Sequence, residues 1–292
     1  MNKPENLPQR AANTAITFAN PTAIAGQFGS IPALAPAPQG GFCMAYSDAN
    51  NSQIWTALSL DCVTWRPVTE IGQQTSVPAL ALFKGVLYML YTGSDSSQIY
   101  STTSADGISW SQAVEIGQQT SIPALAAFGE YLCMVYSDSN SSQLWATQTS
   151  DGTTWSQAVQ IAGQYSSVPA LAAMGDYLYM VYTSNNSSQL YCTRSLDGLN
   201  WEPAQPIQGQ QTSIPALAAF EGLLYMVYSD ANNSQLWVST SGDGVNWSGA
   251  QQIPGQNTSV PALAVAETRL EMVYSGANSS QLYSSYLITG AG

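Results

Sequence analysis

The chain has 292 residues, of which 45% are hydrophobic and only 8% are charged, so it is long enough to bury most of its apolar surface in one core. Eighteen acidic residues against six basic ones give a formal net charge of −12. Such a charge repels phosphate backbones and acidic membrane surfaces, which excludes nucleic acid as an expected partner.

The N-terminal residues 1–13 (MNKPENLPQRAAN) carry no apolar run after their charged residues. We therefore expect a flexible tail there rather than a signal peptide. No later stretch approaches the roughly 20 consecutive apolar residues that a membrane span needs, so no membrane insertion is expected. These features predict a soluble protein that is cytoplasmic or released without a recognisable signal peptide.

An internal repeat organises the rest of the chain. The motif S[IV]PAL recurs every 45 or 46 residues and indicates a single domain, residues 14–292, made of six units. Repeats of this length are typical of propeller blades. The motif begins at Ser30, Ser76, Ser121, Ser167, Ser213 and Ser259.

The first predicted strand precedes the first full unit. Residues 16–30 (ITFANPTAIAGQFGS) align without a gap with residues 153–167 (TTWSQAVQIAGQYSS), and Phe18 takes the place of Trp155. The last unit stops at QLYSSYLITGAG, where its fourth strand should begin. We expect the N-terminal strand to complete the last blade, which would close the ring and remove two exposed sheet edges.

Each unit contains four segments with the period-two alternation of β-strands. They read PALAAF (123–128), a segment such as LYMVY (178–182), QLWATQT (143–149) and WSQAVQI (155–161). A polar Asn/Ser turn separates the second segment from the third, and a DG turn separates the third from the fourth. We therefore predict an all-β fold, a six-bladed β-propeller of four-stranded antiparallel blades.

The turns before the fourth strand carry a recognisable motif: SADGISW (104–110), SLDGLNW (195–201) and SGDGVNW (241–247). These turns resemble the Asp-box of sialidase-type propellers, although they lack one residue between Asp and Gly. From about Thr14 to Thr289 the chain also resembles the six-bladed propeller lectins of fungi and bacteria in blade count and period. The Asp-box resemblance implies structural turns on the side away from any ligand. It assigns that role to Asp106, Asp151, Asp197 and Asp243.

The opposite face is predicted to be rich in amides and hydroxyls, because it carries the Asn/Ser turns and the GQQTS connections between units. Neutral amides beside an aromatic ring suit a sugar, whose hydroxyls need donors and acceptors and whose C–H face stacks on a π surface. Two glutamines recur there in every unit. The first glutamine set is Gln27, Gln73, Gln118, Gln164, Gln210 and Gln256, and the second is Gln53, Gln98, Gln143, Gln189, Gln235 and Gln281.

An aromatic residue follows the second glutamine by two positions and alternates strictly between Trp and Tyr. An Asp follows Tyr-Ser only in every other unit. This alternation indicates an ancestral pair of units used three times, and it favours three strong sites with three weaker or altered ones. Besides the first glutamine set, the predicted carbohydrate-binding residues are Trp55, Tyr100, Trp145, Tyr191, Trp237, Tyr283, Asp48, Asp138 and Asp230.

Structural interpretations of the same residues stay open. An aromatic at this position could pack between blades without meeting a ligand, and the glutamines could bind backbone groups of loops. A methionine that recurs mid-strand is interpreted as a flexible filler between blades. The methionines are Met44, Met89, Met134, Met180, Met226 and Met272.

The inventory of reactive residues argues against an enzyme. The chain has no histidine, which removes Ser-His-Asp and Cys-His systems and most zinc sites. The turns DANNS and DSNSS lack the second acid and the Gly of a strong calcium loop, so no metal or cofactor is predicted. The four cysteines lack the paired spacing of a disulfide frame and the CxxC of a zinc site, which predicts free thiols. The arginine triad that the sialidase resemblance implies does not carry over to Arg10, Arg66, Arg194 and Arg269, which stand at unrelated places in their units.

The favoured hypothesis is a multivalent lectin that binds glycans or glycoconjugates on a cell surface through repeated sites on one face of the propeller. Two alternatives stay open: a propeller scaffold for protein–protein interaction, and a degenerate glycosidase or sialidase-like protein. Assembly into a homo-oligomer also stays open.

Overall fold

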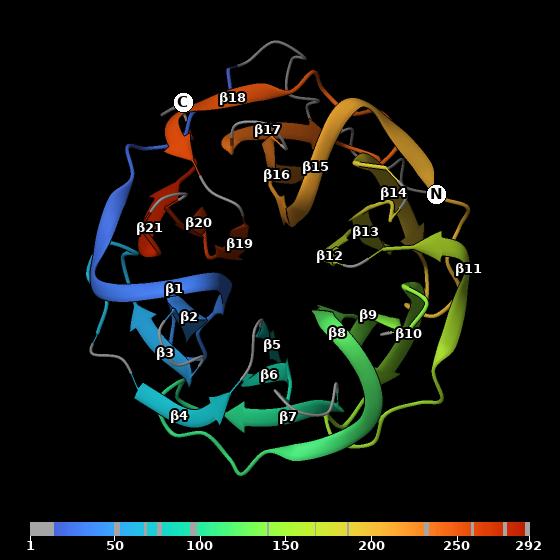
Figure 1. The fold of residues 1–292 in the computed structure, drawn as a ribbon, viewed down its shortest axis with the longest axis horizontal. Helices are drawn as coiled ribbons and strands as arrows, with labels where there is room; N and C mark the ends of the chain where they lie inside the picture. The colour runs from blue at the N-terminus through green and yellow to red at the C-terminus, as the bar shows by residue number, and fades with distance from the viewer. Residues whose placement is uncertain are drawn as a thin grey trace, which may run out of the picture.

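The fold is a ring of antiparallel β-sheets around a central axis (Figure 1). The computed structural model describes residues 15–49, 53–66, 69–74, 78–93, 98–138, 140–166, 168–185, 187–230, 234–257, 260–276 and 279–289, without the side chains of residues 30, 72–74, 118–122, 210–213, 256 and 257. The expected tail, residues 1–13, lies outside the described residues. The prediction of an all-β propeller with four-stranded antiparallel blades is confirmed.

Within these ranges, hydrogen bonds join the strands into three seven-stranded sheets. The first sheet runs β19 (Pro261–Ala266), β20 (Arg269–Ser275), β21 (Gln281–Tyr286), β1 (Thr22–Pro36), β2 (Phe42–Asp48), β3 (Gln53–Ser59) and β4 (Thr69–Gln74). The second runs β11 (Val159–Tyr165), β10 (Gln143–Thr149), β9 (Tyr131–Asp138), β8 (Val114–Phe128), β7 (Gln98–Ser104), β6 (Val86–Thr92) and β5 (Ala79–Phe83). The third runs β12 (Pro169–Met174), β13 (Tyr177–Thr183), β14 (Gln189–Ser195), β15 (Gln205–Phe220), β16 (Leu223–Asp230), β17 (Gln235–Ser241) and β18 (Gln251–Asn257).

Each of these sheets passes from one blade to the next through a single long strand. The first half of β8 pairs with β7 and its second half pairs with β9. In the same way β15 joins β14 to β16, and β1 joins β21 to β2. The segment GQQTS, expected to be a connection between units, is therefore continuous strand in β8 and β15. Gly117 and Gly209 take a φ of +72° there, which bends the strand without ending it.

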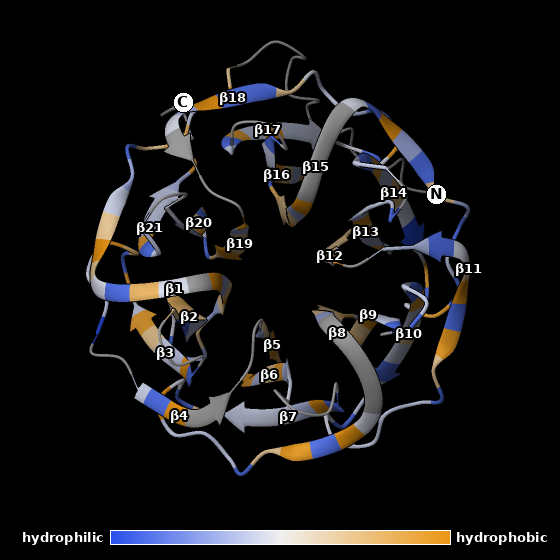
Figure 2. Ribbon diagram, viewed as in Figure 1, coloured by the Kyte–Doolittle hydropathy of each residue, from blue (hydrophilic) through white to orange (hydrophobic). Residues whose placement is uncertain are grey.

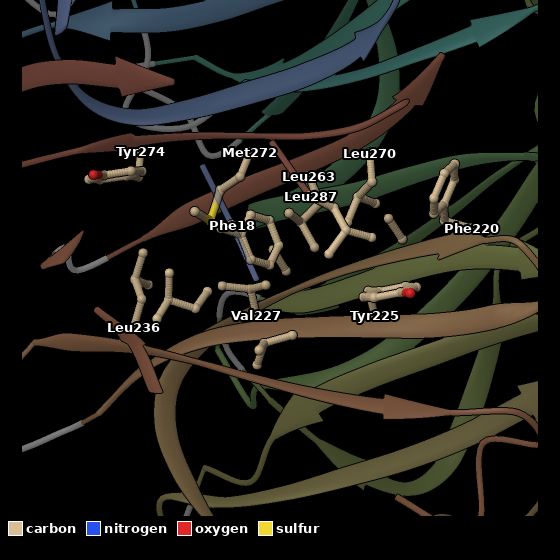
Figure 3. Close-up of a cluster of buried hydrophobic side chains, with 14 residues drawn as sticks. Phe18, Phe220, Tyr225, Val227, Leu236, Leu263, Leu270, Met272, Tyr274 and Leu287 are labelled. Carbon is tan, nitrogen blue, oxygen red and sulfur yellow. The ribbon is translucent and has the colours of Figure 1, made fainter. Parts of the chain in front are cut away.

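The N-terminal strand completes the sheet that the C-terminal strands begin, as predicted. β1 pairs with β21, and ahead of it Phe18 forms an isolated bridge with Leu287. Phe18 is only 8% exposed and belongs to a cluster with Val227, Leu270 and Met272 (Figure 3). The two chain ends are thus joined by backbone hydrogen bonds and by a shared apolar cluster.

The apolar core lies between neighbouring blades. Figure 2 shows the strands nearest the axis, such as β5, β12 and β19, coloured mainly as hydrophobic, whereas β11 on the outside carries both hydrophilic and hydrophobic segments. All six mid-strand methionines are 0% exposed, which confirms their interpretation as fillers between blades. They are Met44, Met89, Met134, Met180, Met226 and Met272.

The outer strand begins later than the sequence predicted. β11 starts at Val159, not at Trp155, because residues 155–158 follow the Asp-box turn before the strand begins. A bulge then interrupts the pairing with β10, and pairing resumes at Gln143 and Tyr165. Gly163 takes a φ of +72° inside the bulge, a conformation that other residues avoid. The Gly-Gln dipeptide of each unit is therefore the signature of a bulge rather than of a loop.

The Asp-box turns are held by hydrogen bonds to a carboxylate. In the box after β14, Asp197 Oδ1 accepts the backbone N–H groups of Leu199 (2.9 Å) and Asn200 (2.7 Å). The hydroxyl of Ser195 lies 3.0 Å from the same oxygen and accepts the N–H of Gly198 at 2.9 Å. The structural role implied by the resemblance is confirmed. The same bonds to the carboxylate recur at Asp61, Asp106, Asp151 and Asp243.

These bonds predict that stability depends on the charge of the box aspartates. The N–H groups of Ser109 and Ile108 hold the pKa of Asp106 at about 2. Because the folded pKa is lowered, the contribution of this carboxylate is complete above its unfolded pKa and is lost as the pH falls toward 2. We expect Asp106→Asn to unfold at lower urea concentration than the wild type at pH 6, with a smaller difference at pH 2.

Asp176→Asn is the control for this experiment, because Asp176 is exposed in the turn before β13 and lies outside the boxes. It should leave the unfolding midpoint nearly unchanged at both pH values. An Asp106→Asn midpoint equal to that of the wild type at pH 6 would contradict the assignment.

Candidate functional site

The two ends of a blade carry different turns. Residues 140–142 precede β10, whereas the Asp-box at residues 150–154 follows it. A seven-residue strand such as β10 spans roughly 20 Å, so the two kinds of turn lie on opposite faces of the ring. The bulge of β11 lies at the first end, since Tyr165 pairs with Gln143. We call this end the bulge face. It comprises residues 140–142, the bulge of β11 and the equivalent residues of the other units.

All six predicted aromatics lie on third strands and pair with a tyrosine of the second strand. In the three tyrosine copies the two rings stack, with centroids 5.6 to 5.7 Å apart and interplanar angles of 15° to 18°. Each predicted aromatic residue is half-buried and packs against a cluster between blades. The pairs are Tyr46–Trp55, Tyr91–Tyr100, Tyr136–Trp145, Tyr182–Tyr191, Tyr228–Trp237 and Tyr274–Tyr283.

The three predicted aspartates end second strands close to these pairs. Asp138 Oδ1 accepts the N–H groups of Asn140 (2.9 Å) and Ser141 (3.0 Å), and the first of these bonds is the main cause that lowers the pKa of Asp138. Burial and, next, the charge of Asp138 raise the pKa of Tyr136 to about 12. Three copies thus bring an Asp, a Tyr and a Trp together. These three clusters are Asp48–Tyr46–Trp55, Asp138–Tyr136–Trp145 and Asp230–Tyr228–Trp237.

The second glutamine set supports the bulges. Gln143 Nε2 donates to the carbonyl oxygens of Ile161 (2.7 Å) and Gln164 (3.0 Å). Gln189 and Gln281 make the same bond to the equivalent isoleucine, at 2.7 Å in both cases. Because a bulge interrupts the strand ladder, its carbonyl groups need other donors, and the glutamine amide supplies one. The structural interpretation of the second set is confirmed at these three positions.

The first glutamine set is described at two positions. Gln27 is 5% and Gln164 is 3% exposed, and Gln164 Nε2 donates to the carbonyl of Glu202 in the next unit at 3.2 Å. Both side chains therefore lie beneath the bulge face rather than on an open rim. Among the described residues, neither Oε1 atom has a hydrogen-bond partner. The side chains of Gln73, Gln118, Gln210 and Gln256 lie outside the described residues.

The arginines of the described ranges lie apart in the ring. Arg194 pairs with Glu202 and Arg269 with Glu271, both at 2.9 Å, in different sheets. Over the same ranges, no three His, Cys, Asp or Glu side chains gather where they could hold a metal ion. No described helix has the length and apolar character of a membrane span. The cysteines Cys43, Cys62, Cys133 and Cys192 are buried and form no disulfide, as predicted.

Two residues that the sequence analysis did not select are exposed on the bulge face. Phe28 is 44% and Tyr165 is 45% exposed, and each follows a glutamine of the first set. These two residues lie three units apart, so they do not follow the alternation of two units by which the other aromatics are recognised. The signal was an aromatic at a position where the other units have Gln74, Gln119, Gln211 and Asn257.

A buried carboxyl lies where the last unit meets the first. Glu271 of β20 is 0% exposed, and its Oε2 accepts a hydrogen bond from Arg269 Nε. Cys62, which takes the glycine position of the first Asp-box, lies beside it. Burial raises the pKa of Glu271 to about 8 and also raises that of the Cys62 thiol. The other units have Cys43, Tyr88, Cys133, Tyr179 and Tyr225 at the position of Glu271.

Several solved structures with a similar fold are sialidases. A Hadza microbial sialidase is 13% identical over 89% of this chain and 66% of its own chain, with a TM-score of 0.67. The NanB sialidase from Streptococcus pneumoniae is 12% identical, over 92% of this chain and 71% of its own, with a TM-score of 0.71. The Trypanosoma rangeli sialidase in complex with the inhibitor DANA is 12% identical over 89% of this chain and 55% of its own chain, with a TM-score of 0.62.

At these identities the likeness shows the fold alone, and it supports the sialidase-type fold that the Asp-box motif implied. The chain spans slightly less than two thirds of the length of the first of these structures. No curated protein sequence matches the chain. A family model described as "BNR repeat-like domain" matches residues 91–290, which is more than half of the chain. The protein therefore belongs to the BNR repeat-like domain family.

Proposed function

We propose that this protein binds carbohydrates through repeated sites on the bulge face. The observation that carries the proposal is the recurrence of the Asp–Tyr–Trp cluster in three copies, each with a half-buried indole. The exposed part of such a ring can stack on the C–H face of a sugar. A neighbouring carboxylate can accept hydrogen bonds from two sugar hydroxyls. The three Tyr–Tyr copies lack the aspartate and would bind more weakly.

The proposed ring has six four-stranded blades. Each long strand, β1, β8 and β15, would end one blade with its first half and begin the next blade with its second half. This count agrees with the six sequence units. Six blades would place the three Asp–Tyr–Trp clusters in alternate blades, which suits a surface coated with glycans.

Weak sites suffice in such an arrangement. A site of about millimolar affinity contributes roughly 4 kcal/mol. Several sites held by one rigid ring can gain about 100-fold in avidity on a dense glycan surface. The sialidases of similar fold support a carbohydrate as the ligand class. Glycans or glycoconjugates on cell surfaces are therefore the proposed partners.

A glycan array tests the proposal, with Trp145→Ala as the variant. Trp145 is half-buried, so we expect roughly tenfold weaker binding from the loss of the stacking surface, with an unfolding midpoint that still shows a folded ring. Trp110→Ala is the control, because Trp110 follows an Asp-box on the opposite face and its loss should lower stability without weakening binding. An array that stays blank at high protein concentration would contradict the function and favour the scaffold. If Trp145→Ala does not fold, the indole is part of the apolar core, which would contradict its assignment to a binding site.

A degenerate sialidase is the second candidate, favoured by the fold neighbours alone. The scattered arginines give no convergent cation set for a substrate carboxylate within the described residues. We expect no release of fluorescent aglycone from 4-methylumbelliferyl sialoside. Release above that of a heat-denatured control would support the hypothesis of a sialidase-like enzyme.

A further inference from the structure

We infer that Phe28 and Tyr165 form two stacking platforms for neutral pyranose rings, on opposite sides of the bulge face. The inference rests on the proposed function and specifies which copies present an open aromatic surface and which sugars they accept. Neither residue belongs to the half-buried aromatic pairs described above, so the platforms add aromatic surface beside Asp48 and Asp138 of two Asp–Tyr–Trp clusters.

Four of the described aromatic side chains are exposed: Tyr131 and Tyr286 at the Asp-box end of their strands, and Phe28 and Tyr165 on the bulge face. The other phenylalanines are Phe18, Phe42, Phe83, Phe128 and Phe220, and each of these is buried or half-buried. Phe28 and Tyr165 leave close to half of their surface open at one equivalent position. A large apolar surface held in water without a packing role is a common mark of a binding site.

The backbone fixes Tyr165 between the turns of two units. The N–H of Ser166 donates to the carbonyl of Ser142 (2.9 Å), in the turn of the same unit, and the N–H of Asn185, in the turn of the next unit, donates to the carbonyl of Tyr165 (3.3 Å). The ring therefore lies where two polar turns meet. A ligand would bind a fixed backbone, which lowers the entropic cost of association.

The same frame recurs around Phe28. The N–H of Gly29 donates to the carbonyl of Ser280 (2.9 Å), and the N–H of Ala49 donates to the carbonyl of Phe28 (3.3 Å). One platform thus lies between the last and first units, and the other lies three units away. Figure 1 shows their strands, β1 and β11, on opposite sides of the ring.

The charges around the platforms select neutral sugars. Asp48, at the end of β2, pairs with Gly29 beside Phe28, and Asp138, at the end of β9, accepts a hydrogen bond from the N–H of Ser142 in the turn beside Tyr165. Among the described residues, Arg66 follows an Asp-box and Lys84 lies in the turn between β5 and β6; Arg194, near the end of β14, binds Glu202, and Arg269, at the start of β20, binds Glu271. A sialic acid carboxylate would therefore meet negative charge without a compensating cation. Amides, hydroxyls and a single acceptor carboxylate suit a neutral pyranose.

The test uses a glycan array printed with neutral oligosaccharides and their sialylated counterparts. Phe28→Gln and Tyr165→Gln introduce the residue that Gln74 provides at this position, so both variants should keep the fold. We expect each single variant to bind neutral glycans about tenfold more weakly, and the double variant about 100-fold more weakly. Tyr165→Phe should bind as the wild type does, because the stacking surface is kept. Tyr131→Gln is the matched control, since Tyr131 is 42% exposed at the start of β9, on the Asp-box face.

The outcomes separate this inference from the proposed function. A wild-type protein that binds no glycan overturns both. Wild-type binding that persists unchanged in the double variant, or that Tyr131→Gln weakens equally, overturns the platforms alone. A preference for sialylated over neutral glycans overturns the assigned sugar class. Thermal unfolding of each variant verifies the fold. If the double variant does not fold, glycan binding by the two single variants tests the platforms.

Discussion

Gly152→Ala is expected to destabilise the ring by about 3 kcal/mol, which combines the cost of a left-handed backbone with that of overpacking. Gly152 has a φ of +77°, and a Cβ atom there would overlap the ring and hydroxyl of Tyr88 on the neighbouring blade. Neither the Asp-box backbone nor a tyrosine packed between two blades can move away at a low cost in free energy. Urea unfolding of the purified variant measures the effect.

Gly163→Ala is the matched control, because Gly163 has a φ of +72° with nothing within 4 Å of the added Cβ. It isolates the backbone cost, about 1 kcal/mol. Equal destabilisation by the two variants would show that the contact with Tyr88 does not matter. The first Asp-box shows how a side chain can be accommodated, since Cys62 occupies the glycine position where Glu271, and not a tyrosine, faces it.

Glu271→Gln is expected to remove a pH dependence of stability. Burial raises the pKa of Glu271 from 4.5 to about 8, although Arg269 beside it acts in the opposite direction; Cys62 and Asp61 face it from the first Asp-box. The folded state therefore holds the proton more tightly than the unfolded state, so stability is complete below pH 4.5 and falls as the pH rises to 8. At about 1.4 kcal/mol per pKa unit, the wild type loses roughly 3 to 5 kcal/mol over this range.

Urea unfolding at pH 5, 7 and 9 tests this expectation. The wild type should lose stability steadily over the series, whereas Glu271→Gln should lose much less and be the more stable protein at pH 9. Glu130→Gln serves as the control for the loss of one charge, because Glu130 is exposed in the turn between β8 and β9. A wild-type curve as flat as that of Glu271→Gln would contradict the buried, protonated carboxyl.

The sequence predicted the features that depend on local pattern. The period-two alternation placed the second and third strands, and the alignment of residues 16–30 with residues 153–167 predicted the pairing of β1 with β21. The Asp-box motif predicted the turns, because Asp197 and its equivalents act on N–H groups two and three residues away. Such contacts are fixed by spacing alone.

Features that depend on contacts between units could not be predicted in the same way. The Gly-Gln dipeptide looked like a loop, because a bulge is recognised only when the partner strand is known; Gln143 then supplies the missing hydrogen bonds. The exposure of Phe28 and Tyr165 depends on the frame of two adjacent turns. The burial of Glu271 depends on the seam between the last and first units, which are far apart in the sequence.

The long strands constrain how such a chain can change its length by recombination. β8 and β15 each supply the outer strand of one sheet segment and the inner strand of the next. Duplication or deletion of a single unit would place two units of the same kind side by side and would break the alternation of Trp and Tyr on the third strands. Exchange of two consecutive units would preserve every such junction. We therefore expect natural relatives built on this plan to differ by even numbers of units.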